Sequence, residues 1–196
     1  MGTRHLIAVH VDGQYKVAQY GQWDGYPEGQ GKDCLKFLRE QYNPEAFKTA
    51  VRACKFIDEE KMRDLMVSYG QKPDGMIAIQ DYNRFSKDHP EFSRDTGSEI
   101  LKIIQNSPEG LMLENALTFA ADSLFCEWAY VIDLDTDTFE VYEGFNQKEL
   151  TPEDRFYFLR EYEVGGYHGV RLVKRWPLSN LPTEDEFDAA FGEEDD

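Results

Sequence analysis

The sequence predicts a single α+β domain, and three observations lead to that prediction. Residues 3–22 read as a β-hairpin around Asp12-Gly13, and residues 127–143 read as a second hairpin around an acidic turn at 135–137. The segments between the hairpins carry apolar residues at helical spacing. We therefore expect an antiparallel sheet built from the two hairpins, with the intervening helices packed on it. Residues 1–182 would form the domain, and residues 183–196 an acidic C-terminal helix and tail.

The composition fits a folded protein of this size. The chain has 196 residues, of which 41% are hydrophobic and 14% aromatic, enough apolar mass for a core. Three Cys at unrelated spacings argue against a disulfide framework. The sequence contains neither a long apolar run typical of a membrane span nor a secretory leader pattern. We therefore expect a cytoplasmic protein that is not in a membrane.

The first hairpin should have a two-residue type I′ turn, because Asp-Gly tolerates the positive φ that both central positions need. That turn pairs Val11 with Gln14 and, if the register continues unchanged, His5 with Tyr20. One side of the hairpin would then carry Ile7, Val9, Val11 and Ala18, and the other side Leu6, Ala8 and Val17. Because both faces are partly apolar, the hairpin should be covered on both sides.

Further elements follow from capping residues and periodicity. Asp33 is expected to cap a helix, and Thr183 with Glu186 has the pattern of a capping box. Residues 70–96 read as irregular. The expected helices are 33–42, 44–54, 58–69, 98–105, 113–125 and 151–162, and one more strand is expected at 168–176.

The charge balance is strongly acidic. The formal net charge is -17, and the last fourteen residues carry eight acids and no base. Without those eight, residues 1–182 still have nine more acidic than basic residues. Such a surface repels phosphate backbones, so we expect no direct nucleic-acid binding, whereas a basic groove on another protein would be attracted. The alternative explanation is that the acidity serves solubility alone.

The open end of the first hairpin is the candidate pocket. The N-terminus and the glycine-rich Trp23–Gly31 loop must lie together there, opposite the turn. A cation, an imidazole, a carboxylate and aromatic groups in one place are what a ligand pocket needs. In the alternative, Trp23 and Tyr26 simply close the end of the sheet. The candidate pocket residues are Thr3, Arg4, His5, Tyr20, Gln22, Trp23, Asp24 and Tyr26.

Other chemical motifs are weaker. Cys34, near a predicted helix start, would be either a thiol of low pKa or a small buried hydrophobic residue. The four His show no metal-ligand spacing. Asp133, Asp135 and Asp137 alternate as in a calcium loop, but the required Gly and final Glu are absent, so we expect an exposed turn. We expect no metal and no cofactor.

Two resemblances bear on origin. The Gly2-Thr3-Arg4 start, Asp12-Gly13 and the motif at Trp23-Asp24-Gly25-Tyr26-Pro27 resemble a group of small uncharacterised proteins frequent in phage genomes, and the 130–144 hairpin is similar to a late hairpin of that group. This chain has Gln22 where many of those proteins place His. The hairpin architecture also resembles N-terminal-nucleophile hydrolases, which would imply a catalytic Thr3 only after cleavage beyond Gly2.

Two functional hypotheses follow. No complete catalytic set can be assembled, which favours a non-catalytic, acidic, phage- or mobile-element-encoded protein that inhibits or redirects a host protein with a basic surface, such as a CRISPR effector or another defence protein. The alternative is a small hydrolase or ligand-binding domain that uses the Trp23–Gly31 loop. The sequence does not indicate an oligomeric state. The expected partner-binding residues are Glu184, Asp185, Glu186, Asp188, Glu193 and Glu194.

Overall fold

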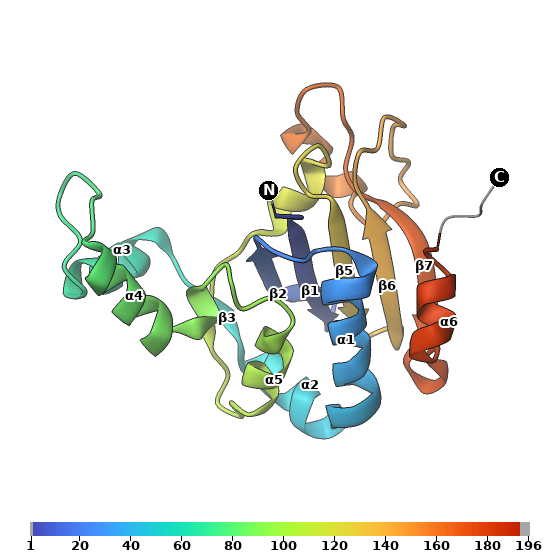
Figure 1. The fold of residues 1–196 in the computed structure, drawn as a ribbon, viewed down its shortest axis with the longest axis horizontal. Coiled ribbons are helices and arrows are strands. Elements are labelled where there is room, and N and C mark those ends of the chain that lie inside the picture. The colour runs from blue at the N-terminus through green and yellow to red at the C-terminus, as the bar shows by residue number, and fades with distance from the viewer. Residues whose placement is uncertain (1, 193–196) are drawn as a thin grey trace.

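A five-stranded sheet forms the centre of the molecule, in the order β2-β1-β5-β6-β7 (Figure 1). The computed structural model describes residues 2–192. Helices cover the sheet, so the α+β prediction is confirmed. The strands are β1 His5–Val11, β2 Gln14–Gly21, β5 Trp128–Asp133, β6 Thr138–Glu143 and β7 Arg171–Pro177.

The two predicted hairpins meet through a parallel pair of strands. β1 runs parallel to β5, from His5 opposite Trp128 to His10 opposite Asp133, whereas the other pairs in this sheet are antiparallel. The predicted wholly antiparallel sheet is corrected in this respect. Because β1 and β5 point the same way, both hairpin turns lie at the same end of the sheet. The amides of Asp12 and Gly13 donate to the Asp135 carboxylate, each at 2.8 Å.

A β-bulge changes the register of the first hairpin. Near the turn the predicted pairs hold, with Val11 opposite Gln14. A shift between Val9 and His10 then places His5 opposite Gly21 rather than Tyr20. A one-residue shift reverses the faces of β2, so Val17, and not Ala18, joins Ile7 and its neighbours in the larger core.

Helices α1 Lys32–Lys36, α2 Pro44–Ala53 and α5 Glu99–Gln105 cover one face of the sheet (Figure 1). The predicted helices over 44–54 and 98–105 are confirmed. Asp33 is not an N-cap, because the helical backbone already begins with a π-helical segment at Pro27. A second π-helical segment, Phe37–Gln41, continues α1 at its C-terminal end. Proline is favoured at a first helical position, so it starts the helix earlier than predicted.

Irregular segments cover the opposite face. Leu117–Ala121 and Tyr157–Tyr162 form 3₁₀ turns, where α-helices were predicted over 113–125 and 151–162. Backbone hydrogen bonds to residues far away in the sequence explain part of the difference between the predicted and observed structure. The Ala116 amide donates to Ala18, and the Ala120 carbonyl accepts from Val170, so these groups bond outside the segment rather than in a regular α-helix.

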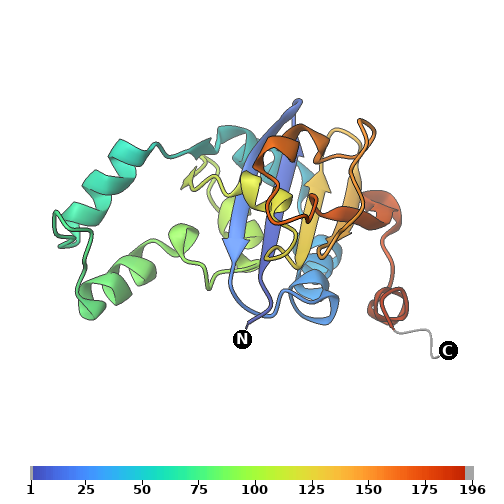
Figure 2. The ribbon, with the colours of Figure 1, turned by 90° about the horizontal axis from the view of Figure 1, so that it is seen from above.

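An arm, residues 57–92, extends from one side of the sheet (Figure 2). It contains α3 Glu59–Ser68, which confirms the helix predicted over 58–69 and has Asp58 as its N-cap, and α4 Ile79–Asp88. Helix α4 corrects the irregular structure predicted for 70–96, and Phe85 is its one buried residue. Two short parallel strands, β3 Lys55–Phe56 and β4 Met112–Leu113, pair beside its base.

The C-terminal helix α6, Glu184–Ala189, lies beside β7. The predicted capping box is present, with the Thr183 hydroxyl accepting from the Glu186 amide and Glu186 accepting from the Thr183 amide. Phe187 is fully buried in the larger core and stacks near Phe139 and Trp176. The helix is therefore packed onto the residue 1–182 body rather than separate from it.

Candidate functional site

The predicted pocket residues lie at the end of the sheet opposite the hairpin turns, but their burial differs widely. Thr3 and His5 are buried, whereas Trp23, Asp24 and Tyr26 are exposed. The Gly25 amide donates to the Thr3 carbonyl at 3.0 Å, and Tyr130 Oη donates to the Gly25 carbonyl at 2.7 Å. The loop is thus fastened across the end of β1.

The side chains at this end do not converge on one cavity centre. Arg4 pairs with Glu127 at 3.7 Å rather than with Asp24, and its guanidinium covers the Phe125 ring. Trp23 Nε1 donates to Asp95 at 2.8 Å. The structure does bring Tyr20 and Gln22 together, through a 2.6 Å hydrogen bond from the Tyr20 hydroxyl. These contacts turn each polar group toward a different neighbour.

The imidazole of His5 is enclosed at this end. A side chain at Gly21 would collide with its ring, and neither ring nitrogen has a hydrogen bond of good geometry within residues 2–192. Burial lowers the pKa of His5 to about 4 and outweighs the opposing effect of the nearby Thr3 backbone. His5 is therefore neutral at physiological pH.

Position 2 has no space for a nucleophile. A Cβ at Gly2 would collide with the Trp23 ring, and Thr3 is 4% exposed with Trp23 and Gly25 around it. An N-terminal nucleophile acts from an exposed position with a free amine beside it. The packing around Gly2 and Thr3 gives no support to a hydrolytic residue here.

A buried ionic cluster lies near the opposite end of the sheet, centred on Arg155. Its Nε donates to Glu140 at 2.7 Å, and its Nη2 donates to Asp133 at 2.5 Å. Both carboxylates are almost fully buried, and the guanidinium lowers the pKa of Asp133 to about 2 and that of Glu140 below its usual value, although burial opposes both shifts. The Tyr142 hydroxyl also donates to Glu140, at 2.5 Å.

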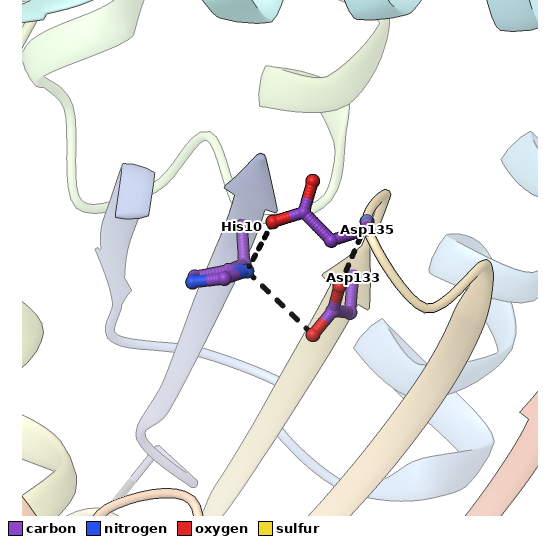
Figure 3. A group of neighbouring side chains, drawn as sticks. All are labelled: His10, Asp133 and Asp135. Carbon is purple, nitrogen blue, oxygen red and sulfur yellow. Dashed lines mark hydrogen bonds and ion pairs between the residues drawn. The ribbon is translucent and has the colours of Figure 1, made fainter. Parts of the chain in front are cut away.

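His10 joins Asp133 and Asp135 at the edge of this cluster (Figure 3). Its Nδ1 lies 3.2 Å from Asp135 Oδ2 and 3.6 Å from Asp133 Oδ2, while the other ring nitrogen points away from both carboxylates. His10 lies opposite Tyr15 across the first hairpin, and the two rings meet edge to face. Asp133 is 3% exposed, so the predicted exposed turn is wrong at that position: Arg155 compensates its charge.

Within residues 2–192, His10, Asp133 and Asp135 form a group that could hold a metal ion, with ligand atoms within 4.8 Å of one another. Each carboxylate already has partners, however. Asp133 accepts from Arg155 and from the amides of Asp135 and Thr136, and Asp135 accepts from two amides of the first turn. A cation would have to compete with the guanidinium, so the arrangement is well explained as a tie between the two turns.

A pocket of about 530 Å³ opens over this cluster. Most of its lining residues are polar, and the guanidinium groups of Arg155 and Arg175 point toward the buried carboxylates of the cluster. Arg155 is used by Asp133 and Glu140, and Arg175 donates to Glu140 at 2.8 Å. Both guanidinium groups of the pocket are therefore paired with buried carboxylates, although the Arg175 side chain is still 52% exposed. Its lining residues are His10, Gly13, Tyr15, Glu153, Arg155, Phe158 and Arg175.

The C-terminal acids predicted to bind a partner are partly used within the chain. Lys32 Nζ contacts Asp188 at 2.6 Å, Lys36 contacts Glu184 at 3.5 Å, and Glu186 serves the capping box. Asp185 is exposed. Glu193 and Glu194 lie outside the described residues.

The arm has few buried side chains, and Phe85 is the one buried residue between positions 57 and 92. No residue of α3 is buried. Three large apolar side chains of the arm are more than half exposed: Val67 at 53%, Met76 at 60% and Ile79 at 70%. Tyr69 packs edge-on against Phe85 and His89, which links the two helices. No motif within residues 57–92 predicts a function for this segment.

Comparisons of the chain with protein-family models, curated proteins and solved structures give no match. Within residues 2–192 no helix is both long enough and apolar enough to span a bilayer.

Proposed function

We propose that this protein is a non-catalytic interaction protein that binds a partner protein with a basic surface, and that the arm makes the apolar part of the contact. The single observation that carries the proposal is the exposure of Val67, Met76 and Ile79 on a segment that stands away from the sheet. Exposed apolar groups gathered on a projecting segment are typical of protein-binding surfaces.

The net charge supports the choice of partner. At -17 the protein repels a second copy of itself and any other strongly acidic protein, while it attracts a basic one over a distance set by ionic strength. An apolar contact surrounded by acidic residues combines short-range affinity with that long-range attraction. Both features fit a basic partner better than self-association.

The resemblance of the opening motif to phage-encoded proteins gives the partner its expected origin. In that case the partner is a host protein, and binding inhibits or redirects it. A defence effector that holds nucleic acid in a basic channel has the required surface, because an acidic protein can occupy such a channel in place of the phosphate backbone.

Photocrosslinking tests the proposal. A photoreactive amino acid at position 76 should capture one predominant partner in host cells, and the purified partner should bind the unmodified protein in a titration. Met76→Asp and Ile79→Asp should each raise the Kd of that binding at least tenfold, which corresponds to a loss of about 1.4 kcal/mol of binding free energy. Val164→Asp, at an equally exposed apolar side chain outside the arm, is the matched control.

Two outcomes would contradict the proposal. A partner that binds equally well to the Ile79→Asp and Val164→Asp variants does not use the arm. A stable homodimer in light scattering that dissociates on Ile79→Asp would show that the arm serves self-association instead.

A further inference from the structure

A groove lies at the base of the arm, between α3 and the segment that follows β4. It has a volume of about 620 Å³ and is lined from one side by residues 57–71 and from the other by residues 114–116. The apolar part of the lining is made by Ile57, Met62, Met66 and Ala116. Met76 and Ile79, the exposed apolar residues between α3 and the start of α4, do not line this groove.

Methionine gives the groove an adaptable floor. Met62 and Met66 are four residues apart on α3, so they lie on the same face of that helix. Both are only partly buried. The unbranched thioether side chain adjusts to irregular apolar surfaces, and methionine is used in this way at peptide-binding surfaces.

The rim of the groove is acidic. Asp58, Glu59 and Glu114 line it, and Arg63 is the single base among the lining residues within the described chain. Asp58 is held by Lys61, at 2.8 Å. Glu114 has no ion pair or side-chain hydrogen bond within residues 2–192, and although its side chain reaches solvent, the surrounding groove walls raise its pKa above the usual range. A cationic group beside Glu114 would relieve that unfavourable environment.

We propose that this groove binds a basic amphipathic helix of the partner, whose apolar side chains lie on Met62 and Met66 while lysine or arginine side chains face the acidic rim. The inference rests on the proposed function and adds to it the site and the chemistry of the bound segment. An amphipathic helix places apolar residues on one face at spacings of three and four, which suits a groove with an apolar floor.

Charge complementarity separates this occupant from the others. A second copy would bring a net charge of -17 to an acidic rim, and an anionic ligand would meet Glu59 and Glu114. An uncharged apolar molecule would use the methionines but not the carboxylates. A basic helix is the occupant that uses both halves of the groove.

A designed peptide provides the probe. A fluorescent peptide of about 14 Leu and Lys residues, arranged to give about four turns of amphipathic helix, is titrated with the full chain and followed by anisotropy. The expected result is saturable binding with helix formation in the peptide. The same composition in an order without a helical apolar face should bind at least about tenfold more weakly, because attraction by charge alone does not use the floor.

Substitutions in the groove locate the binding site. Met62→Asp should weaken peptide binding about tenfold or more, and Glu114→Gln should weaken it several-fold, with the loss shrinking at high salt. Glu161→Gln, at an exposed acid away from the arm, is the charge-matched control. Since α3 has no buried residue, Met62→Asp should leave the fold intact, and circular dichroism and the unfolding midpoint check this. Glu114→Gln changes no apolar contact and serves as the second variant.

The outcomes separate this inference from the proposed function. If Met62→Asp and Glu114→Gln bind the peptide as well as the control does, or if the two peptides bind alike, the groove is not the site and the inference is overturned. If the captured partner depends on Ile79 but not on Met62, the proposed function survives alone. If the partner depends on neither, the proposed function fails, while the peptide titration still decides the groove.

Discussion

Arg155 and Glu140 form an ion pair of 2.7 Å between a residue just before the Tyr157–Tyr162 turn and the middle of strand β6. Glu140 is 1% exposed, and the same guanidinium also holds Asp133 at the end of β5. One side chain therefore pairs with two buried carboxylates on adjacent strands and fastens the 144–170 segment to the sheet, while Arg175 supplies Glu140 with a second positive charge.

Arg155→Met should destabilise the fold by about 3–5 kcal/mol, because it removes the guanidinium from buried Asp133 and leaves buried Glu140 with Arg175 alone. The midpoint of denaturant unfolding measures this, with Arg171→Ala as a control at an exposed position, expected within about 0.5 kcal/mol. A loss for Arg155→Met no larger than that of the control would show that the cluster is not a structural tie.

The three thiols should resist modification until the protein unfolds. Cys34, Cys54 and Cys126 are free and fully buried, and burial raises the pKa of each thiol. The hypothesis of a low-pKa Cys34 therefore fails, and its description as a small buried hydrophobic residue holds. Intact-mass analysis should show no labelling by a maleimide in native buffer and three labels in denaturant. Rapid native labelling of Cys34 would contradict this.

Local rules predicted the elements whose residues determine them locally. Asp12 and Gly13 both adopt positive φ, as the type I′ turn requires, and Asn43 and Asp58 cap α2 and α3. These features depend on neighbours within a few residues. The parallel pairing of β1 with β5 joins residues more than a hundred positions apart, and no local pattern specifies such a partner.

The Arg155 cluster was missed for a related reason. Glu140 occupies a polar position in the alternation of Thr138 to Val141, a pattern that favours a solvent-facing side chain. Its burial, which only the structure shows, requires a counter-charge nearby. The sequence does not say which base supplies it. Arg155 and Arg175 are both in reach only because β6 and β7 are paired and the 144–170 segment folds back over the sheet.

Asp24→Asn should leave stability within about 0.5 kcal/mol of the unmodified protein, because the Asp24 side chain is exposed and its backbone adopts φ 54°, which Asn tolerates. Gly25→Ala is the contrast. Its Cβ would lie 2.7 Å from the Thr3 carbonyl oxygen and 2.9 Å from His5 Cβ, so overpacking should cost on the order of 1–3 kcal/mol. Thermal and chemical unfolding of both variants check the difference.

That pair of variants bears on the role of the Trp23–Gly31 loop. Trp23 is 48% exposed, so Trp23→Ala should cost less than the roughly 3–5 kcal/mol typical of a buried tryptophan. If the loop only closes the sheet end, function should follow the folded fraction in every variant. Full stability of Asp24→Asn with loss of partner binding would instead give this loop a binding role.

Stability should fall as the pH drops from about 6.5 to 4, because His5 is neutral in the folded state. Its pKa is about 4 when folded and about 6.5 when unfolded, so the unfolded chain binds the extra proton in this interval. The contribution of neutral His5 to the free energy of unfolding is fully present above pH 6.5. It is lost as the pH falls to the folded-state pKa, by about 3 kcal/mol over the full interval. Below about pH 4 the loss of the Asp133–Arg155 pair adds to it, since the pKa of Asp133 is depressed to about 2.

Denaturant midpoints of the wild type and of His5→Gln between pH 4 and 7.5 test the origin of this slope. Gln cannot titrate, so the variant should be less pH-dependent than the wild type between 6.5 and 4, even where its absolute stability is lower. Arg155→Met is not a control for this slope, because without the guanidinium burial raises the pKa of Asp133 and of Glu140. Arg171→Ala, at an exposed position, should keep the wild-type slope. An unchanged slope in His5→Gln would assign the acid sensitivity to other groups and would show that the folded state accommodates a charged His5.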